Sequence, residues 1–135
     1  PEFQTDGPPP ASRFGQRLQR RYGSQPLGLT LQQADRHALD HLHRNLIAGG
    51  EAPAAAARVL RQLLMRDLMT ADVQGAADLR TVTGAMTALA EFALDAAMAT
   101  ALAELDALHG APLAAGGQRA RLWIVGMGKL GAREL

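Results

Sequence analysis

Cysteine is absent from this 135-residue sequence, which excludes disulfide bonds, a thiolate nucleophile and a cysteine-bound metal. Aromatic residues make up 4% of the chain, and alanine supplies much of its 47% apolar content. That composition favours closely packed helices over a β-sheet. The net charge is only +1, and no uninterrupted apolar run approaches the ~18 residues of a membrane span. We therefore expect neither nucleic acid nor a membrane as a partner.

The first 29 residues are predicted to form a disordered or weakly helical N-terminal segment. Residues 1–12 are rich in proline and nearly free of apolar side chains, so we expect them to be disordered. Apolar residues at every fourth position over residues 13–22 predict one short helix. Its arginines form either a solvated face or a docking site for an anionic partner, and the near-neutral chain favours the solvated face.

The start of the chain does not have the pattern of a signal peptide, because it is acidic and rich in proline rather than basic and apolar. Together with the absence of cysteine, this predicts a cytoplasmic protein. The first residue is Pro1 rather than Met, and the chain stops at Leu135 within a glycine motif. We therefore expect the chain to be a segment of a longer protein.

Residues 30–120 are predicted to form a helical region. A first helix begins at Thr30, with Gln33 as its reciprocal capping partner, and ends at a pair of glycines. A second helix begins at Pro53, because proline suits the first turn of a helix. The third and longest runs from about residue 78 to residue 108. It spans ~45 Å and needs helical partners to be stable.

The last part of the chain, residues 121–135, is predicted to begin a different kind of unit. The apolar run 122–125 enters a segment with glycine at positions 126, 128 and 131, and residues that favour helix follow. A strand, a glycine turn and a helix in this order are typical of backbone that approaches a phosphate group. The sequence thus predicts a mainly α fold, in which a helical bundle leads into the first strand and glycine turn of an α/β domain.

Two pairs of polar residues have the spacing of possible metal ligands. His37 and His41 lie one helical turn apart, but the metalloprotease pattern needs a Glu after the first histidine, where Ala38 stands. Glu91 and Asp95 are likewise one turn apart and could share a metal ion or a proton. We interpret the histidines as surface residues and the two acids as the polar margin of an amphipathic helix.

The three glycines also match the dinucleotide-binding pattern G-x-G-x-x-G, which is weak on its own. In that class an acidic residue ~20 positions later binds the ribose, and that position lies beyond Leu135. Lys129 does not make the segment a mononucleotide P-loop, because the G-x-x-x-x-G-K-[ST] spacing is absent. Two alternatives therefore stay open: a dinucleotide-dependent oxidoreductase, and a non-catalytic helical interaction module with a structural glycine turn.

The final ten residues, GMGKLGAREL, resemble a motif of the bifunctional glutamine synthetase adenylyltransferases, also called adenylyl-removing enzymes. The motif of that family has the form GMGKLGG-x-EL and follows an apolar strand. Helical segments upstream are similar as well, so the resemblance covers roughly residues 55–135. It identifies residues 121–135 as the truncated start of a nucleotidyltransferase domain, more similar to the N-terminal, adenylyl-removing copy of the family than to its C-terminal copy.

The resemblance implies a nucleotide- or phosphate-binding role for Gly126, Gly128, Lys129, Gly131 and Ala132. Ala132 stands where the family has glycine or a small polar residue, so its methyl group is expected to crowd the phosphate. The family removes AMP from a tyrosine of glutamine synthetase by phosphorolysis, and adds AMP from ATP. The implied cofactors are Mg²⁺ with ATP, ADP or phosphate, and the implied partners are glutamine synthetase and the PII signal protein.

The carboxylate pair that holds Mg²⁺ in this family would lie beyond Leu135. None of the 135 residues is therefore assigned a catalytic or metal-binding role. Metal ions neutralise the phosphate charge in this kind of transfer, so we expect the chain alone to be inactive and to bind none of these cofactors. The longer protein is expected to be a nucleotidyltransferase.

Overall fold

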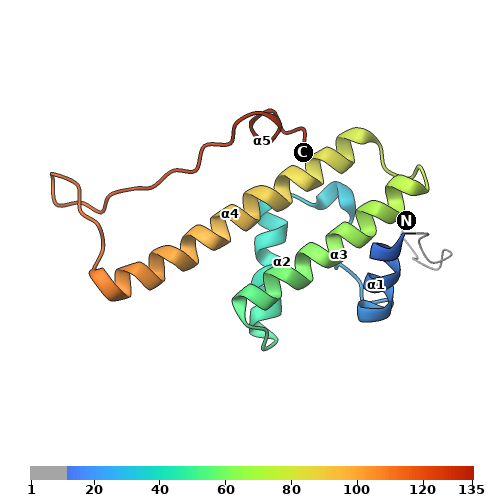
Figure 1. Cartoon of the computed structure of the whole chain (residues 1–135), viewed down its shortest axis with the longest axis horizontal. Coiled ribbons are helices and arrows are strands. Elements are labelled where there is room, and N and C mark those ends of the chain that lie inside the picture. Colours follow the sequence, from blue (N-terminus) through green and yellow to red (C-terminus); the bar gives the residue numbers. More distant parts are fainter. Residues whose placement is uncertain (1–11) are drawn as a thin grey trace.

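The computed structural model describes residues 12–135, and the prediction of disorder for residues 1–12 falls almost wholly outside that range. The described part is mainly helical, as predicted (Figure 1). It contains no β-strand, only an isolated antiparallel bridge between Leu113 and Arg119. The elements in chain order are α1 (Arg13–Tyr22), the 3-10 helix η1 (Leu31–Gln33), α2 (Arg36–Ala48), α3 (Pro53–Val73), α4 (Leu79–His109) and α5 (Lys129–Ala132).

Helix α1 is the short basic helix that the sequence predicts. The side chain of Ser12 caps it by accepting a hydrogen bond from the Gly15 amide at 3.0 Å. Leu18 is buried against the bundle, and the Tyr22 hydroxyl bonds to the Gln62 side chain of α3. The arginines of α1 lie on the exposed side.

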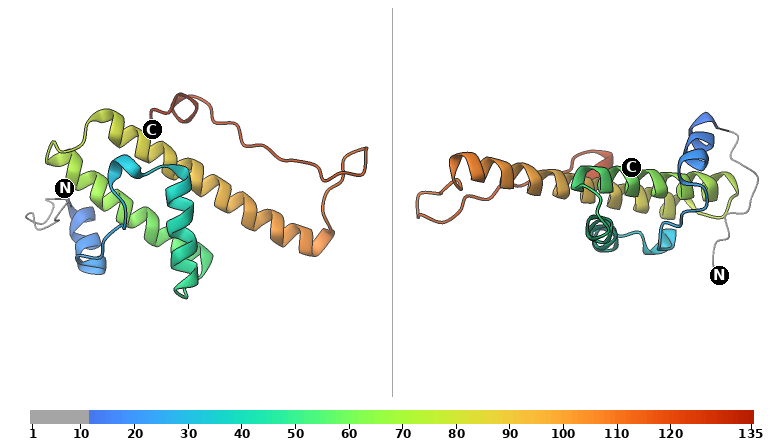
Figure 2. Two further views of the ribbon diagram at one scale, coloured as in Figure 1. Left: turned by 180° about the vertical axis from the view of Figure 1, so that it is seen from behind. Right: turned by 90° about the horizontal axis from the view of Figure 1, so that it is seen from below.

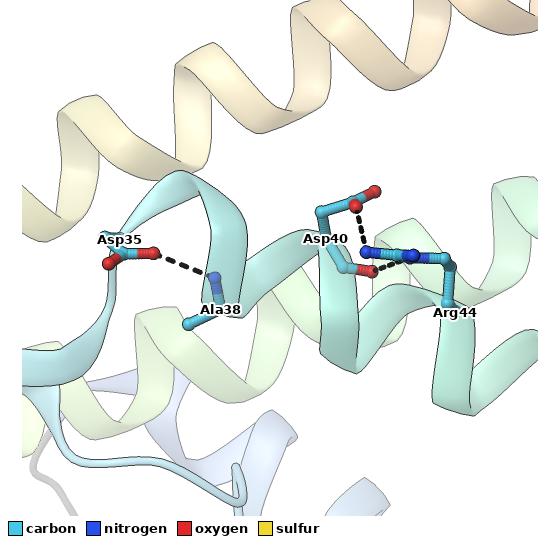
Figure 3. Close-up of polar contacts among 4 residues, drawn as sticks. All are labelled: Asp35, Ala38, Asp40 and Arg44. Atoms are coloured by element: carbon cyan, nitrogen blue, oxygen red, sulfur yellow. Dashed lines mark hydrogen bonds and ion pairs between the residues drawn. The ribbon is translucent and has the colours of Figure 1, made fainter.

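The helix predicted to start at Thr30 starts later. Thr30 and Gln33 form the expected reciprocal contact, with the Thr30 amide donating to the Gln33 side chain at 3.0 Å, but only the three-residue η1 follows. Asp35 then adopts an extended backbone and accepts a hydrogen bond from the Ala38 amide at 2.8 Å (Figure 3). Since an N-cap residue is non-helical, this second cap interrupts the helix and starts α2 at Arg36.

Helices α3 and α4 agree with the predicted boundaries. Pro53 occupies the first turn of α3, which ends before Gln74. Asp78 caps α4, and Gly110 ends it after 31 residues. Helix α2 packs against both α3 and α4, while α1 packs on α3.

The core is formed where these helices meet. Leu39 of α2 and Leu60 and Leu64 of α3 are almost completely buried, and so is one face of α4 between Ala85 and Phe92. The C-terminal part of α4 projects past the other helices in every view (Figures 1 and 2). After Phe92, Ala96 still packs against the core, whereas Leu105 and Leu108 are exposed, with 76% of Leu108 accessible.

The length and composition of α4 match those of a membrane-spanning helix. An 18-residue window reaches a mean hydropathy of 1.3, and 28% of that window is buried. The core helix of a soluble protein passes the same test, and the N-terminal half of α4 has that role here. Length and composition are therefore weak evidence for a membrane span.

Two buried polar side chains connect the helices. His43 lies 2.9 Å from the Pro53 carbonyl oxygen, to which its Nε2 donates, and its ring meets Phe92 edge-on at 5.2 Å. Arg66 of α3 pairs with Asp67 at 2.7 Å and donates to the Gly23 carbonyl at 3.3 Å. Buried polar groups are costly without partners, so these contacts fix α2 on α3 and the end of α1 on α3.

Truncation of a core leucine tests this packing. Leu64 is fully buried, so Leu64→Ala should lower the free energy of unfolding by about 2–5 kcal/mol. Leu105→Ala is the matched control, because 51% of Leu105 is exposed on the projecting half of α4; its effect should be about 0.5 kcal/mol or less. Urea denaturation followed by circular dichroism measures both. Equal losses would contradict the assignment of the core.

The cap of α4 predicts a specific pH dependence. Hydrogen bonds from the Thr81 side chain and backbone amide lower the pKa of the Asp78 carboxyl below its ordinary value of 3.8. The ionised cap therefore stabilises the fold above the unfolded pKa, and that contribution is lost as the pH falls through the lower folded pKa.

Asp78→Asn keeps a capping side chain but removes this titration. The unfolding temperature of the variant should therefore fall less than that of the unchanged chain between about pH 6 and about pH 2. Asp78→Ser, a second uncharged cap, should behave like Asp78→Asn. Scanning calorimetry at the two pH values measures the difference, and identical acid sensitivity in all three proteins would refute the role of the cap.

Candidate functional site

The candidate site lies in the C-terminal arm, which we define as residues 110–135. The arm leaves α4 at Gly110 and runs back along that helix (Figure 1). Close to its start, the Ala120 amide donates to the Pro112 carbonyl at 2.8 Å, which closes a small loop. An ion pair of 2.5 Å between Arg119 and Asp106 connects this loop to the end of α4.

The strand predicted at residues 122–125 is not formed. These residues carry no assigned secondary structure, and Leu122, Trp123 and Val125 are 64%, 74% and 78% exposed. A strand requires backbone pairing with a neighbouring strand, and no such neighbour is found among residues 12–135. The apolar and β-branched composition of the run is typical of a strand, but it does not supply a partner.

The glycine segment, residues 126–131, folds back on itself. A Cβ atom at position 131 would lie 2.6 Å from the Gly126 carbonyl oxygen, so any side chain there would force the backbone apart. A Cβ at position 126 would lie 3.0 Å from Leu130 Cγ. Gly128 has open space around it but a φ of +58°, which disfavours other residues. Close backbone packing thus requires glycine at position 131, the positive φ favours glycine at position 128, and a side chain at position 126 would require Leu130 to shift.

Helix α5 follows as a single turn. The Ala132 amide donates to the Gly128 carbonyl at 2.9 Å, and the Glu134 amide donates to the Lys129 carbonyl at 2.8 Å. The amides at the start of a helix have no partner within it, so those of the first turn are the groups able to receive an anion. The Ala132 amide is already used. Lys129 is exposed, and a turn of four residues is too short to add an appreciable dipole.

The residue pairs that have the spacing of possible metal ligands do not come together around a metal within residues 12–135. His37 and His41 are exposed on α2, and Asp40 beside them pairs with Arg44 at 2.6 Å (Figure 3). No group of three or more His, Cys, Asp or Glu residues that could hold a metal ion is found in the described part of the chain.

The two acids of α4 bind separate arginines. Glu91 pairs with Arg133 and Asp95 pairs with Arg36, each at 3.0 Å. Both carboxylates are thus used by ion pairs within the chain. Their position on the helix agrees with the interpretation of a polar margin.

A shallow groove of about 340 Å³ lies elsewhere, and the sequence analysis did not find it. Leucines of α2, α3 and the segment after α1 form its floor, and Asn45 and Glu51 lie at its rim. No residue of the C-terminal arm lines it. Since its walls come from three separate segments with no shared spacing, no sequence pattern marks it.

Comparison with known proteins gives a consistent result. The family model described as glutamate-ammonia ligase adenylyltransferase matches residues 15–135. A bifunctional glutamine synthetase adenylyltransferase/adenylyl-removing enzyme from Burkholderia mallei is 45% identical over 106 residues, which cover 74% of this chain and 12% of that protein. The protein of the same name from Ralstonia nicotianae is 50% identical over 86 residues, or 63% of this chain and 9% of that protein.

The chain spans about a tenth of the length of these curated relatives. No solved structure matches it at a significant level. The family match covers nearly all the described residues, from α1 through the helical region to the glycine segment. The chain belongs to the glutamate-ammonia ligase adenylyltransferase family.

Proposed function

We propose that this chain is the part of a bifunctional glutamine synthetase adenylyltransferase/adenylyl-removing enzyme that carries a helical region and the phosphate-binding glycine segment of the adenylyl-removing domain. The observation that carries the proposal is the motif GMGKLGAREL in a chain whose family match extends from residue 15 to residue 135. The packing supports it, because a Cβ atom at position 131 would lie 2.6 Å from the Gly126 carbonyl oxygen, which leaves no room for a side chain there. The family assignment favours this chemistry over a dinucleotide-dependent oxidoreductase.

In the proposed reaction, a phosphate oxygen attacks the phosphorus of the AMP group on a glutamine synthetase tyrosine. A new phosphorus–oxygen bond forms to phosphate, the bond to the tyrosine oxygen breaks, and ADP and a reprotonated tyrosine result. The close turn of the glycine segment would bring its backbone near a phosphate oxygen, and Lys129 would offset the phosphate charge. Gly126, Gly128 and Gly131 would shape the backbone around it, with Ala132 at the edge of the site.

The residues present do not fit a magnesium site. Glu91 and Asp95 are each bound to an arginine, and Glu134 is the only acid after the glycine segment. Mg²⁺, ATP and ADP are therefore cofactors and ligands that we propose for the longer protein, held by a carboxylate pair outside these 135 residues. The chain alone contributes phosphate positioning without the metal ligands that this kind of transfer uses.

Further parts of the proposal concern the cellular context. Glutamine synthetase is the proposed substrate protein, and the PII signal protein is the proposed regulator. The protein is proposed to act in the cytoplasm, without a nucleic-acid or membrane partner. The near-neutral charge and the use of α4 as a core helix support this proposal.

The chain alone should not catalyse adenylyl removal. Purified chain mixed with adenylylated glutamine synthetase and phosphate should release no ADP above the rate without protein, because the metal-binding carboxylates are missing. A coupled assay for ADP measures this, with the full-length Burkholderia mallei relative as the positive control. ADP release by the chain at a rate proportional to its concentration would refute the expectation.

The role of the glycine segment is tested in a chimera in which residues 15–135 replace the matching segment of the Burkholderia mallei relative. The chimera should remove AMP from glutamine synthetase. Gly131→Ala should lower kcat/KM by about 100-fold, because relieving the 2.6 Å contact displaces the backbone by about 1 Å.

Gly116→Ala is the matched control for Gly131→Ala. A Cβ atom at position 116 would meet only the Gln118 side chain, at an ordinary distance of 3.5 Å. The control should leave kcat/KM unchanged. A chimera in which both variants have the same activity would show that the glycine segment does not form the phosphate site.

A further inference from the structure

Arg133 lies at the end of the glycine segment in an unusual backbone conformation. Its φ is 61°, and it is the one non-glycine residue with positive φ among residues 12–135. Such a conformation is costly for a residue with a long side chain, and it persists only where surrounding contacts hold it. The Arg133 amide donates to the Leu130 carbonyl at 3.2 Å, so the main chain of Arg133 closes α5.

The side chain of Arg133 connects the segment to α4. Its Nη1 lies 3.0 Å from Glu91 Oε1, across 42 residues of sequence. Glu91 is about one-third exposed and directly precedes Phe92, which is 2% exposed in the core. The carboxylate is thus carried by the rigid part of α4 rather than by its projecting half.

The same part of α4 is fixed to α2. Asp95, one turn after Glu91, pairs with Arg36 at the start of α2 at 3.0 Å. The two carboxylates that pair with α2 and with the end of the glycine segment therefore lie on consecutive turns of α4. The other ion pair of the arm, Arg119 with Asp106, joins the small loop at the start of the arm to the end of α4 and involves no residue of the glycine segment.

We propose that Glu91 and Arg133 are positioning residues that fix the phosphate-binding glycine segment on the rigid part of α4. This inference rests on the proposed function of the segment. Because the Arg133 guanidinium is directed to Glu91 and the Arg133 backbone closes the turn, we assign the pair to positioning and not to phosphate binding. The pair couples the placement of the glycine segment to the packing of α2 on α4.

The test measures the placement of the arm in the 135-residue chain itself, so it does not depend on enzymatic activity. Because the chain has no cysteine, the pair of substitutions Ala97→Cys and Met127→Cys gives two specific spin-label sites on α4 and in the glycine segment. Both positions are exposed, with Met127 84% accessible. Pulsed electron spin resonance then reports the distribution of distances between the labels.

Four proteins that carry both spin labels are compared. One keeps Glu91 and Arg133, and two carry the single substitutions Glu91→Gln and Arg133→Gln. The fourth is the charge-swapped double variant, Glu91→Arg with Arg133→Glu. Each single variant should lower the ratio of docked to undocked arms by about two- to five-fold, the range expected for one partly exposed ion pair. The double variant should restore the narrow distribution. Thermal unfolding temperatures should stay equal in all four, because the core is not changed.

Arg119→Gln is the matched control, because it removes the other ion pair of the arm. It should leave the distribution of distances between the two labels unchanged. Single variants that keep the narrow distribution would overturn the proposal, as would failure of the charge swap to restore it. A control variant that broadens the distribution as much as Arg133→Gln would also overturn it.

In the chimera described above, Glu91→Gln should lower kcat/KM, and the charge swap should restore it, whereas the swap should not rescue Gly131→Ala. If the label distances in the 135-residue chain follow these expectations but the chimera is inactive, the positioning role stands and only the proposed function is refuted.

Discussion

The structure depends on the burial of one face of α4 between Ala85 and Phe92. Helix α2, helix α3 and the 3-10 helix η1 each contact α4, and α2 and η1 also contact α3. Apolar burial is the largest favourable term in folding, and here it is concentrated on about two turns of one helix. The ion pairs at Glu91 and Asp95 lie at the edge of the same stretch. The placement of the glycine segment is therefore a consequence of how the core packs.

The helical boundaries were largely predictable because their causes are local. Pro53 at the first turn of α3, and Gly110 after α4, act through backbone geometry that involves only nearby residues. The error at Thr30 has the same origin. Two capping residues lie five positions apart, and the sequence alone does not say that Asp35 rather than Thr30 starts the continuous helix.

Features that depend on distant residues were less predictable. The apolar spacing along α4 continues to Leu108, and it identifies a face without saying what covers it; the second half of that face is exposed. The run at residues 122–125 has the composition of a strand, but pairing requires a neighbour that no local pattern reveals. In the candidate site, the glycines were identified from their spacing. The Arg133–Glu91 pair was missed because its partners are 42 residues apart.

The bond from buried Arg66 to the Gly23 carbonyl changes the character of the N-terminal helix. A ten-residue helix at the edge of a domain would normally fray and unfold locally at little cost. Here, separating α1 from α3 would remove a partner from a guanidinium that is only 6% exposed, and would uncover Leu18 as well. We therefore expect helix α1 to unfold together with the core, which would keep its four arginines on a fixed surface of the domain until the domain unfolds.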